Sequence, residues 1–81
     1  MKLQVRLFAA ARQWAKASTI ELEVPAKSTV AEVRKALMGQ VPQLAQFGPQ
    51  LRLAVNREYA QDSAVICPDA DVACIPPVSG G

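Results

Sequence analysis

Two segments near the start of the chain alternate between apolar and polar residues. In residues 2–8 (KLQVRLF) and again in residues 18–24 (STIELEV), every second side chain is apolar. A period of two is typical of a strand with one buried face. Because only about ten residues separate the two segments, the sequence predicts a hairpin whose connection is itself structured.

A helix is predicted after the second strand, which Pro25 ends. Thr29 and Glu32 have the spacing of a capping box, in which the threonine caps the helix and the glutamate reaches back to it. The apolar residues that follow recur at helical spacing and form one stripe, which we expect to pack on the sheet. These residues are Val30, Val33, Leu37 and Val41.

The second half of the chain contains three further strand signals. Residues 42–50 form a linker with proline and glycine, and residues 51–55 (LRLAV) then alternate again. Residues 56–57 (NR) indicate a turn, after which residues 58–60 predict a short strand. The last strand is predicted at residues 71–75.

This order of elements predicts an α+β fold, with one main helix packed on one face of a mixed sheet of about five strands. The first and last strands would lie side by side in the centre, which is the β-grasp arrangement of ubiquitin. A chain of 81 residues supports one hydrophobic core. We therefore expect a single domain over residues 1–76, followed by a flexible tail at residues 77–81.

The composition is that of an ordinary globular domain, with 51% apolar residues, 20% charged residues and a net charge of +2. So small a positive charge, with no basic cluster among aromatic residues, argues against nucleic-acid binding. No apolar run is long enough for a membrane helix. We therefore expect neither nucleic acid nor a membrane as a partner, and a cytoplasmic location.

The residues available for chemistry are few. The chain has no histidine, which excludes the Ser-His and Cys-His dyads of nucleophilic catalysis. Cys67 and Cys74 lack the spacing and the partners of a zinc site, and we interpret both as small, reduced apolar residues. We expect no metal site, no bound cofactor and no catalysis by this chain alone.

Strand parity predicts a group of exposed apolar side chains. If the alternating apolar residues of the first strand face the core, Phe8 faces the opposite side, because successive side chains alternate. By the same parity Ile75 faces outward near the end of the last strand, and Tyr59 lies beside a turn. Three such side chains near one sheet face predict a patch that binds a partner.

The sequence ends on CIPPVSGG, residues 74–81. Pro76 and Pro77 have no N–H, so strand pairing must end there, and their fixed φ directs the chain away from the sheet. A segment without side chains can enter a narrow channel of another protein and present its carboxylate there. We therefore predict a reactive end in this segment. Its residues are Val78, Ser79, Gly80 and Gly81.

Four motifs spread over the chain resemble the small-subunit family of molybdopterin synthase, whose members are ubiquitin-like sulfur carriers. The motifs are LFAAAR at 7–12, STVAEVRKAL at 28–37, AVN at 54–56 and DADVACIPPVSGG at 69–81. The PPVSGG ending is the most specific of them. The resemblance covers essentially the whole chain.

The resemblance implies a sulfur-transfer chemistry centred on Gly81. An ATP-dependent activating enzyme would adenylate the Gly81 carboxylate, and a sulfur donor would replace AMP to leave a thiocarboxylate. The tail would then enter the synthase large subunit, within a heterotetramer, and give its sulfur to a pterin precursor. The residues expected to contact partners are Phe8, Arg12, Tyr59, Ile75, Pro76, Pro77, Val78 and Ser79.

Three alternatives share much of this sequence pattern. The related carrier of the thiamine pathway also ends in Gly-Gly. A ubiquitin-like protein modifier would use the same activation and then acylate a lysine through Gly81. The third alternative is a β-grasp interaction module in which the Gly-Gly ending has no chemical role.

Overall fold

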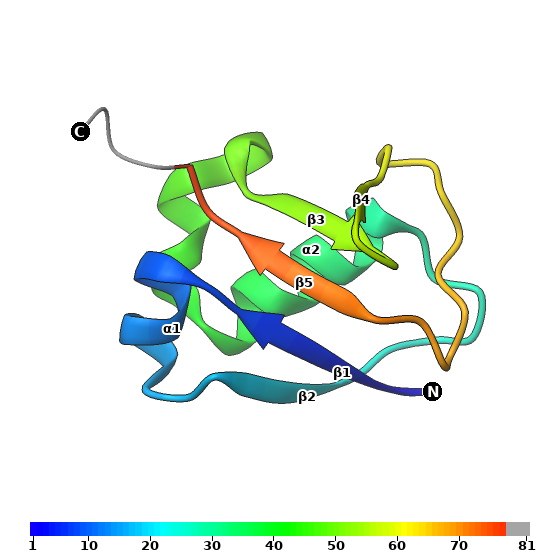
Figure 1. Ribbon diagram of the computed structural model, residues 1–81, viewed down its shortest axis with the longest axis horizontal. Coiled ribbons are helices and arrows are strands. Elements are labelled where there is room, and N and C mark those ends of the chain that lie inside the picture. The colour runs from blue at the N-terminus through cyan, green and yellow to red at the C-terminus, as the bar shows by residue number, and fades with distance from the viewer. Residues whose placement is uncertain (78–81) are drawn as a thin grey trace.

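A computed structural model describes residues 1–77 of the chain, apart from the side chain of Pro49. Its centre is a five-stranded sheet with the strand order β2-β1-β5-β3-β4. β1 and β5 pair in parallel, whereas the other neighbours pair antiparallel. Figure 1 shows β1 and β5 side by side in the middle of the sheet, as the sequence predicted. The strands are β1 (Lys2–Leu7), β2 (Thr19–Glu23), β3 (Arg52–Val55), β4 (Glu58–Tyr59) and β5 (Val72–Ile75).

The main helix, α2 (Val30–Gln40), begins at the predicted capping box. The backbone N–H of Glu32 donates to Thr29 Oγ1 at 3.3 Å, and the Thr29 N–H donates to Glu32 Oε1 at 3.1 Å. The helix ends one residue before Val41, the last residue of the predicted stripe. Val41 is nevertheless buried, and its N–H still donates to the carbonyl of Leu37 at 2.9 Å.

The expectation of one main helix is incomplete, because residues 1–77 contain two more helical segments. The connection between β1 and β2 forms α1 (Ala9–Ala15). Its sequence, AAARQWA, is rich in alanine, the residue with the highest helix propensity, and it packs through the buried Ala11. At seven residues α1 is too short to give a clear helical period in the sequence.

The predicted linker at residues 42–50 is also structured, as the 3₁₀ segment η1 (Pro42–Gln50). Pro42 stands at its first turn, where a proline loses no helical hydrogen bond. Gly48, with φ 55° and ψ −135°, interrupts the helical geometry near the end of the segment. The proline and glycine that suggested an irregular linker are therefore the residues that start and interrupt this helix.

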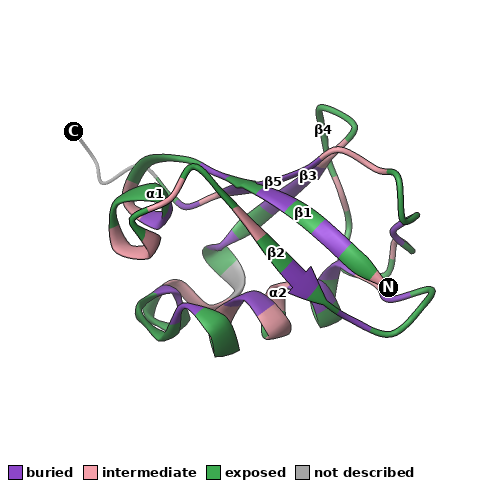
Figure 2. Ribbon diagram, turned by 90° about the horizontal axis from the view of Figure 1, so that it is seen from below, coloured by how far each residue is buried: buried purple, intermediate pink, exposed green. Residues whose placement is uncertain are grey.

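The core lies between the sheet and α2, as Figure 2 shows. β1 alternates strictly between exposed and buried residues, and its three apolar side chains point inward. β5 departs from strict alternation because Ala73, on the outer face, is also covered. The largest fully buried side chains include Leu3, Leu22, Leu37, Leu44, Leu51, Leu53 and Ile66.

Candidate partner-docking site

The outer face of the sheet, opposite α2, carries the candidate site. The strand register sets one row of residues across four strands: Arg6 on β1 is paired with Ala73, Ala73 with Ala54, and Ala54 with Tyr59. Paired residues project from the same face of a sheet. Two small alanines thus stand in the middle of this row, between an arginine on one side and a tyrosine on the other.

A second row lies next to the first, toward the end of β5. Ile75 is paired with Arg52 of β3, and Phe8 directly follows β1. The N–H of Phe8 donates to the carbonyl of Cys74 at 3.3 Å, so the backbone contact between the two central strands extends beyond β1. Phe8 is therefore held beside the outward-facing end of β5.

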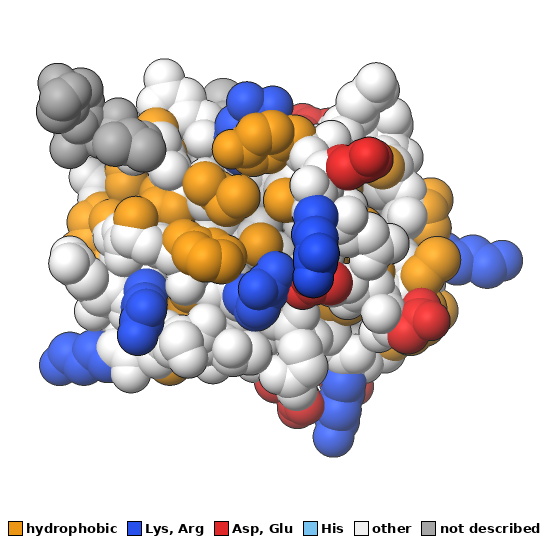
Figure 3. Space-filling model, in the orientation of Figure 1, with side chains coloured by type: hydrophobic (Ala, Val, Ile, Leu, Met, Phe, Trp, Pro, Cys, Tyr) orange, Lys and Arg blue, Asp and Glu red, His pale blue; other side chains and the backbone are white. Residues whose placement is uncertain are grey.

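Together these residues enclose a shallow hollow of about 260 Å³, hereafter the docking hollow. Ala54 and Ala73 provide small side chains at its centre, and larger side chains surround them. Phe8 is 43% exposed and Tyr59 is 56% exposed, while Ile75 is partly buried. Figure 3 shows apolar side chains gathered on this face, with basic side chains around them. The lining residues are Arg6, Phe8, Ala54, Arg57, Tyr59, Ala73 and Ile75.

The structure therefore brings together Phe8 and Ile75, which strand parity placed on the outer face, and Tyr59, which was expected there because it lies beside a turn. It also adds residues that the sequence reasoning missed, namely the two alanines and two arginines of the docking hollow. The alternation of LRLAV and DVACI could have placed both alanines on the outer face. At about 260 Å³ the docking hollow is smaller than typical small-molecule pockets. Its size suits a side chain of another protein.

Two arginines lie over the aromatic rings of this face. The guanidinium carbon of Arg52 is 3.9 Å from the centroid of the Tyr59 ring. That of Arg6 is 5.6 Å from the centroid of the Phe8 ring. Both distances are within the range of cation–π attraction. These contacts favour one orientation of each ring before any partner binds.

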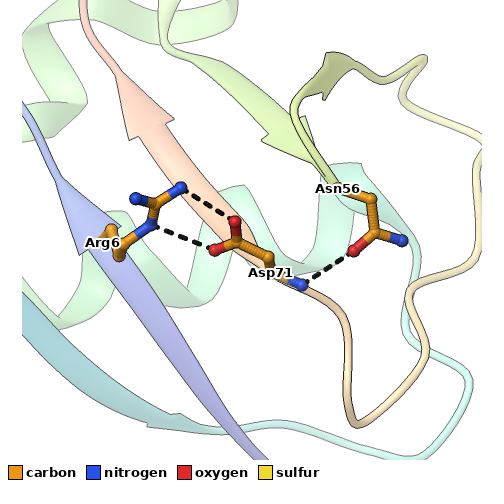
Figure 4. Close-up of polar contacts among 3 residues, drawn as sticks. All are labelled: Arg6, Asn56 and Asp71. Atoms are coloured by element: carbon orange, nitrogen blue, oxygen red, sulfur yellow. Dashed lines mark hydrogen bonds and ion pairs between the residues drawn. The ribbon is translucent and has the colours of Figure 1, made fainter.

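Arg6 is itself held by Asp71, the residue that precedes β5 (Figure 4). Its Nε donates to Asp71 Oδ1 at 3.0 Å and its Nη2 donates to Oδ2 at 2.8 Å. The Asp71 N–H donates to Asn56 Oδ1 at 3.0 Å, which links the β3–β4 turn to this pair. Both charged side chains are nearly half exposed, so the pair contributes about 1 kcal/mol or less to stability. Its main effect is to orient Arg6.

The other predicted contact residues do not line the docking hollow. Arg12 is exposed on α1, outside the hollow. Pro76 differs from the expectation of a partner contact because its side chain is fully buried, which anchors the end of β5 in the domain. Pro77 is exposed. The predicted contacts and reactive residues Val78, Ser79, Gly80 and Gly81 lie outside the described residues.

Pro77 borders a second hollow, between α1 and η1. There Trp14 of α1 stacks on Phe47 of η1, with ring centroids 5.4 Å apart and an angle of 21° between the ring planes. This hollow was not predicted from the sequence, because neither α1 nor η1 was expected as a helix. The chain thus leaves the domain between two surface hollows, one beside Ile75 and one beside Pro77.

The two cysteines differ in environment. Cys67 is exposed, whereas Cys74 is buried on the inner face of β5. Burial raises the pKa of the Cys74 thiol to about 12, and the positive charge of Arg34 offsets this only in part. Within residues 1–77, histidine, cysteine and acidic side chains form no group of three or more that could hold a metal ion.

The helices described for residues 1–77 include none long and apolar enough to cross a membrane.

The strand order and the main helix, α2, packed on one face of the sheet define a ubiquitin-like β-grasp domain. The chain belongs to the ThiS family, whose model matches residues 5–81. It is 35% identical over 81 residues to the molybdopterin synthase sulfur carrier subunit of Arabidopsis thaliana. That match covers 100% of this chain and 84% of the relative.

Solved structures agree with this assignment. SAMP1 from Haloferax volcanii, a small archaeal modifier protein, superimposes with a TM-score of 0.84 at 28% identity, over 100% of both chains. A chain in the complex of subunits 1 and 2 of the molybdopterin-converting factor from Helicobacter pylori 26695 has the same fold. Its TM-score is 0.65 at 18% identity, again over 100% of both chains.

Proposed function

We propose that this protein is the sulfur carrier subunit of molybdopterin synthase and works in the cytoplasm. The observation that carries the proposal is the docking hollow at the end of β5, next to the point where Pro76 and Pro77 lead out of the domain. The match to a molybdopterin synthase sulfur carrier subunit over all 81 residues of this chain supports it. A carrier needs a docking surface for partners and a reactive end, but no active site of its own.

The reactive group in this proposal is the carboxylate of Gly81. A carboxylate is a poor electrophile, so an activating enzyme first joins it to AMP from ATP and releases pyrophosphate. A sulfur donor then displaces AMP and leaves a thiocarboxylate. In the large subunit, this sulfur forms a C–S bond to a pterin precursor, its bond to the Gly81 carbonyl carbon is cleaved by water, and the Gly81 carboxylate is restored. The chain holds no cofactor, and the partners supply the acids and bases of each step.

The docking surface in this proposal binds the large subunit. In support, the H. pylori neighbour is a complex of two subunits of the molybdopterin-converting factor. We further propose that two carriers and two large subunits form a heterotetramer. The activating enzyme would use the same surface, since both partners must receive the same tail. Binding of one partner would then exclude the other, and the carrier must dissociate between activation and transfer.

Removal of Gly81 is the direct test. Residues 78–81 span at most about 14 Å when extended, and a misplacement of 1 Å can cost about a hundredfold in rate. The chain lacking Gly81, and a chain with one residue added after it, should both lose sulfur transfer. Gly81→Ala, which keeps the length, should retain part of it. The melting temperatures should change little, because none of these changes touches the core.

The measurement is intact mass after incubation with activating enzyme, ATP and a sulfur donor, followed by pterin sulfuration with the large subunit. The unchanged chain should gain the mass of one oxygen-to-sulfur replacement. A truncated chain that still formed a thiocarboxylate and supported sulfuration at the normal rate would contradict the proposal. So would failure of the unchanged, activated chain to sulfurate the pterin.

A second candidate function is protein modification, because SAMP1, at 28% identity, belongs to the small archaeal modifier proteins. The two functions share activation and differ in the acceptor. Adducts of Gly81 on lysine side chains that survive a thiol reductant would support a modifier. A thiocarboxylate consumed only with the large subunit and its pterin would support the carrier, and would also separate it from a thiamine-type carrier.

A further inference from the structure

Arg57 occupies an unfavourable backbone conformation beside the docking hollow. The turn between β3 and β4 consists of Asn56 with φ 53° and Arg57 with φ 72°. Hairpin turns with two positive φ angles strongly favour Asn followed by Gly. Asparagine tolerates this conformation, but arginine carries a Cβ that is strained in it. The second turn position therefore holds an arginine where glycine would be more stable.

Arg57 is one of the residues that line the docking hollow. Residues held in sparsely populated backbone regions are concentrated at functional sites. An arginine in this conformation lowers the stability of the folded protein. Because Arg57 lies at the docking hollow, a role in binding a partner would explain why an arginine is found there.

The charges around the hollow are not balanced within the domain. Arg6 is neutralised by Asp71 at 2.8 Å. Over residues 1–77, however, Arg57 and Arg52 have no carboxylate within ion-pair distance. Arg52 is instead held over the Tyr59 ring. Two uncompensated positive charges thus flank a hollow with an apolar centre.

We propose that Arg57 and Arg52 select the partner by its charge, which is an inference that rests on the proposed function and deepens it. The occupant is a protein surface that places an apolar side chain in the docking hollow and carboxylates opposite the two arginines. Charged groups at the rim of an interface act mainly on the association rate and its salt dependence. The strained Arg57 therefore contributes to partner recognition at the expense of stability.

The chain offers a matched pair of variants for the test. Lys27, in the loop before α2, is also an exposed basic residue with a positive φ, of 64°, and it lies outside the docking hollow. Arg57→Gly and Lys27→Gly each remove one positive charge and place glycine in a left-handed conformation. Both should raise the melting temperature, because both relieve the same kind of strain.

The two variants should differ only in binding. The probe is the large subunit of molybdopterin synthase from the same organism, and the measurement is the association rate with the complete chain over a range of NaCl concentrations. At low salt, Arg57→Gly should associate about 3- to 10-fold more slowly and show a weaker salt dependence. Lys27→Gly should match the unchanged chain. Arg57→Lys, which keeps the charge, should restore most of the rate.

Three outcomes would overturn the inference. The first is normal association of Arg57→Gly, and the second is an equally slow rate for Arg57→Lys, which would exclude charge as the cause. The third is tighter binding to heparin, used as a model polyanion, than to the large subunit, with loss of that binding in Arg57→Gly. If the unchanged chain did not bind the large subunit at all, the proposed function itself would fail, and this inference with it.

Discussion

The two faces of the sheet are formed by the same strands but differ in how far their side chains are buried. On the inner face, the leucine, valine and cysteine side chains of the three central strands are buried against α2 and its neighbours, apart from Val55, which is partly buried. On the outer face, the small side chains of Ala54 and Ala73 form the floor of the hollow, between partly exposed aromatic and basic side chains. The inner face is covered by α2 and its neighbours, whereas the outer face carries an exposed hollow.

Because of this difference, the inner face contributes mainly to the stability of the fold and the outer face mainly to binding. Burying a leucine or valine side chain contributes about 1.5–3 kcal/mol, so the inner face supplies most of the folding free energy. Phe8 and Tyr59 leave much of their apolar area in water and contribute less to folding. Aromatic and arginine side chains of this kind carry much of the binding energy in protein interfaces. Changes on the two faces should therefore have different consequences.

The largest expected difference between a buried and an exposed position is in the rate at which the two cysteine thiols react. A pKa of about 12 leaves roughly one Cys74 thiol in 10⁵ ionised at pH 7, and burial also blocks access to it. Cys67 is exposed. Iodoacetamide should modify Cys67 at least about a hundredfold faster in the native protein. Intact mass should show one label before unfolding and two in denaturant, whereas rapid double labelling of the native chain would contradict the inner position of Cys74.

A cavity on the inner face should lower stability most among single substitutions. Leu37 is fully buried on α2, and Leu37→Ala should reduce the free energy of unfolding by about 3–5 kcal/mol. Urea unfolding followed by circular dichroism measures this loss. Lys35→Ala, at an exposed position of the same helix, should change it by about 0.5 kcal/mol or less. Equal losses for the two variants would contradict the packing of α2 on the sheet.

A charge introduced on the outer face should weaken the binding of partners more than it lowers the stability of the fold. Ile75→Asp places a carboxylate at the docking hollow and should weaken the complexes with both the large subunit and the activating enzyme at least about 10-fold. The free energy of unfolding should fall by only about 1 kcal/mol. Val65→Asp makes a similar change at an exposed position outside the hollow and should leave both complexes intact. Calorimetric titrations that showed no effect of Ile75→Asp on either complex would exclude this face as the shared surface.

The features predicted correctly from the sequence depend on local patterns. The alternation of the strands fixed which side of β1 and β5 is buried, and the Thr29–Glu32 spacing fixed the start of α2. Parity alone placed Phe8 and Ile75 on the outer face, and the neighbouring turn placed Tyr59 on the surface. Each of these inferences needs only the geometry of one element.

The missed features depend on contacts between distant segments. α1 is short and owes its position to packing through Ala11, and η1 begins at a proline that suggested a loop. Arg57 reaches the docking hollow only because the β3–β4 turn folds beside β5, which no local pattern reveals. Pro76 ends the strand as expected, but its burial depends on the residues around it. Tertiary packing decided each of these cases.

The smallest expected effect concerns a contact that belongs to neither face. Arg34 of α2 donates from Nε to the carbonyl of Leu51 at 2.7 Å and from Nη2 to Asp62 Oδ1 at 2.8 Å. The hydrogen bond from Arg34, reinforced by its positive charge, lowers the pKa of the Asp62 carboxyl below its ordinary value. This contact ties α2, which covers the inner face, to the loop after β4. It should therefore affect stability and leave docking unchanged.

The direction in which the stabilisation by the Arg34–Asp62 contact changes with pH follows from the lowered pKa of the Asp62 carboxyl. Because the folded state holds the Asp62 carboxylate more strongly than the unfolded state does, the contact stabilises the protein fully above the ordinary aspartate pKa of 3.8. That contribution is lost as the pH falls through the lower, folded-state pKa. Asp62→Asn should thus have a lower urea midpoint than the unchanged chain at pH 7, and the two midpoints should converge in acid.

Asp69→Asn, which removes a charge from an exposed site without an ion pair among the described residues, is the control. A difference between Asp62→Asn and the unchanged chain that stayed constant from neutral to acidic pH would show that the carboxylate charge is not what Arg34 stabilises.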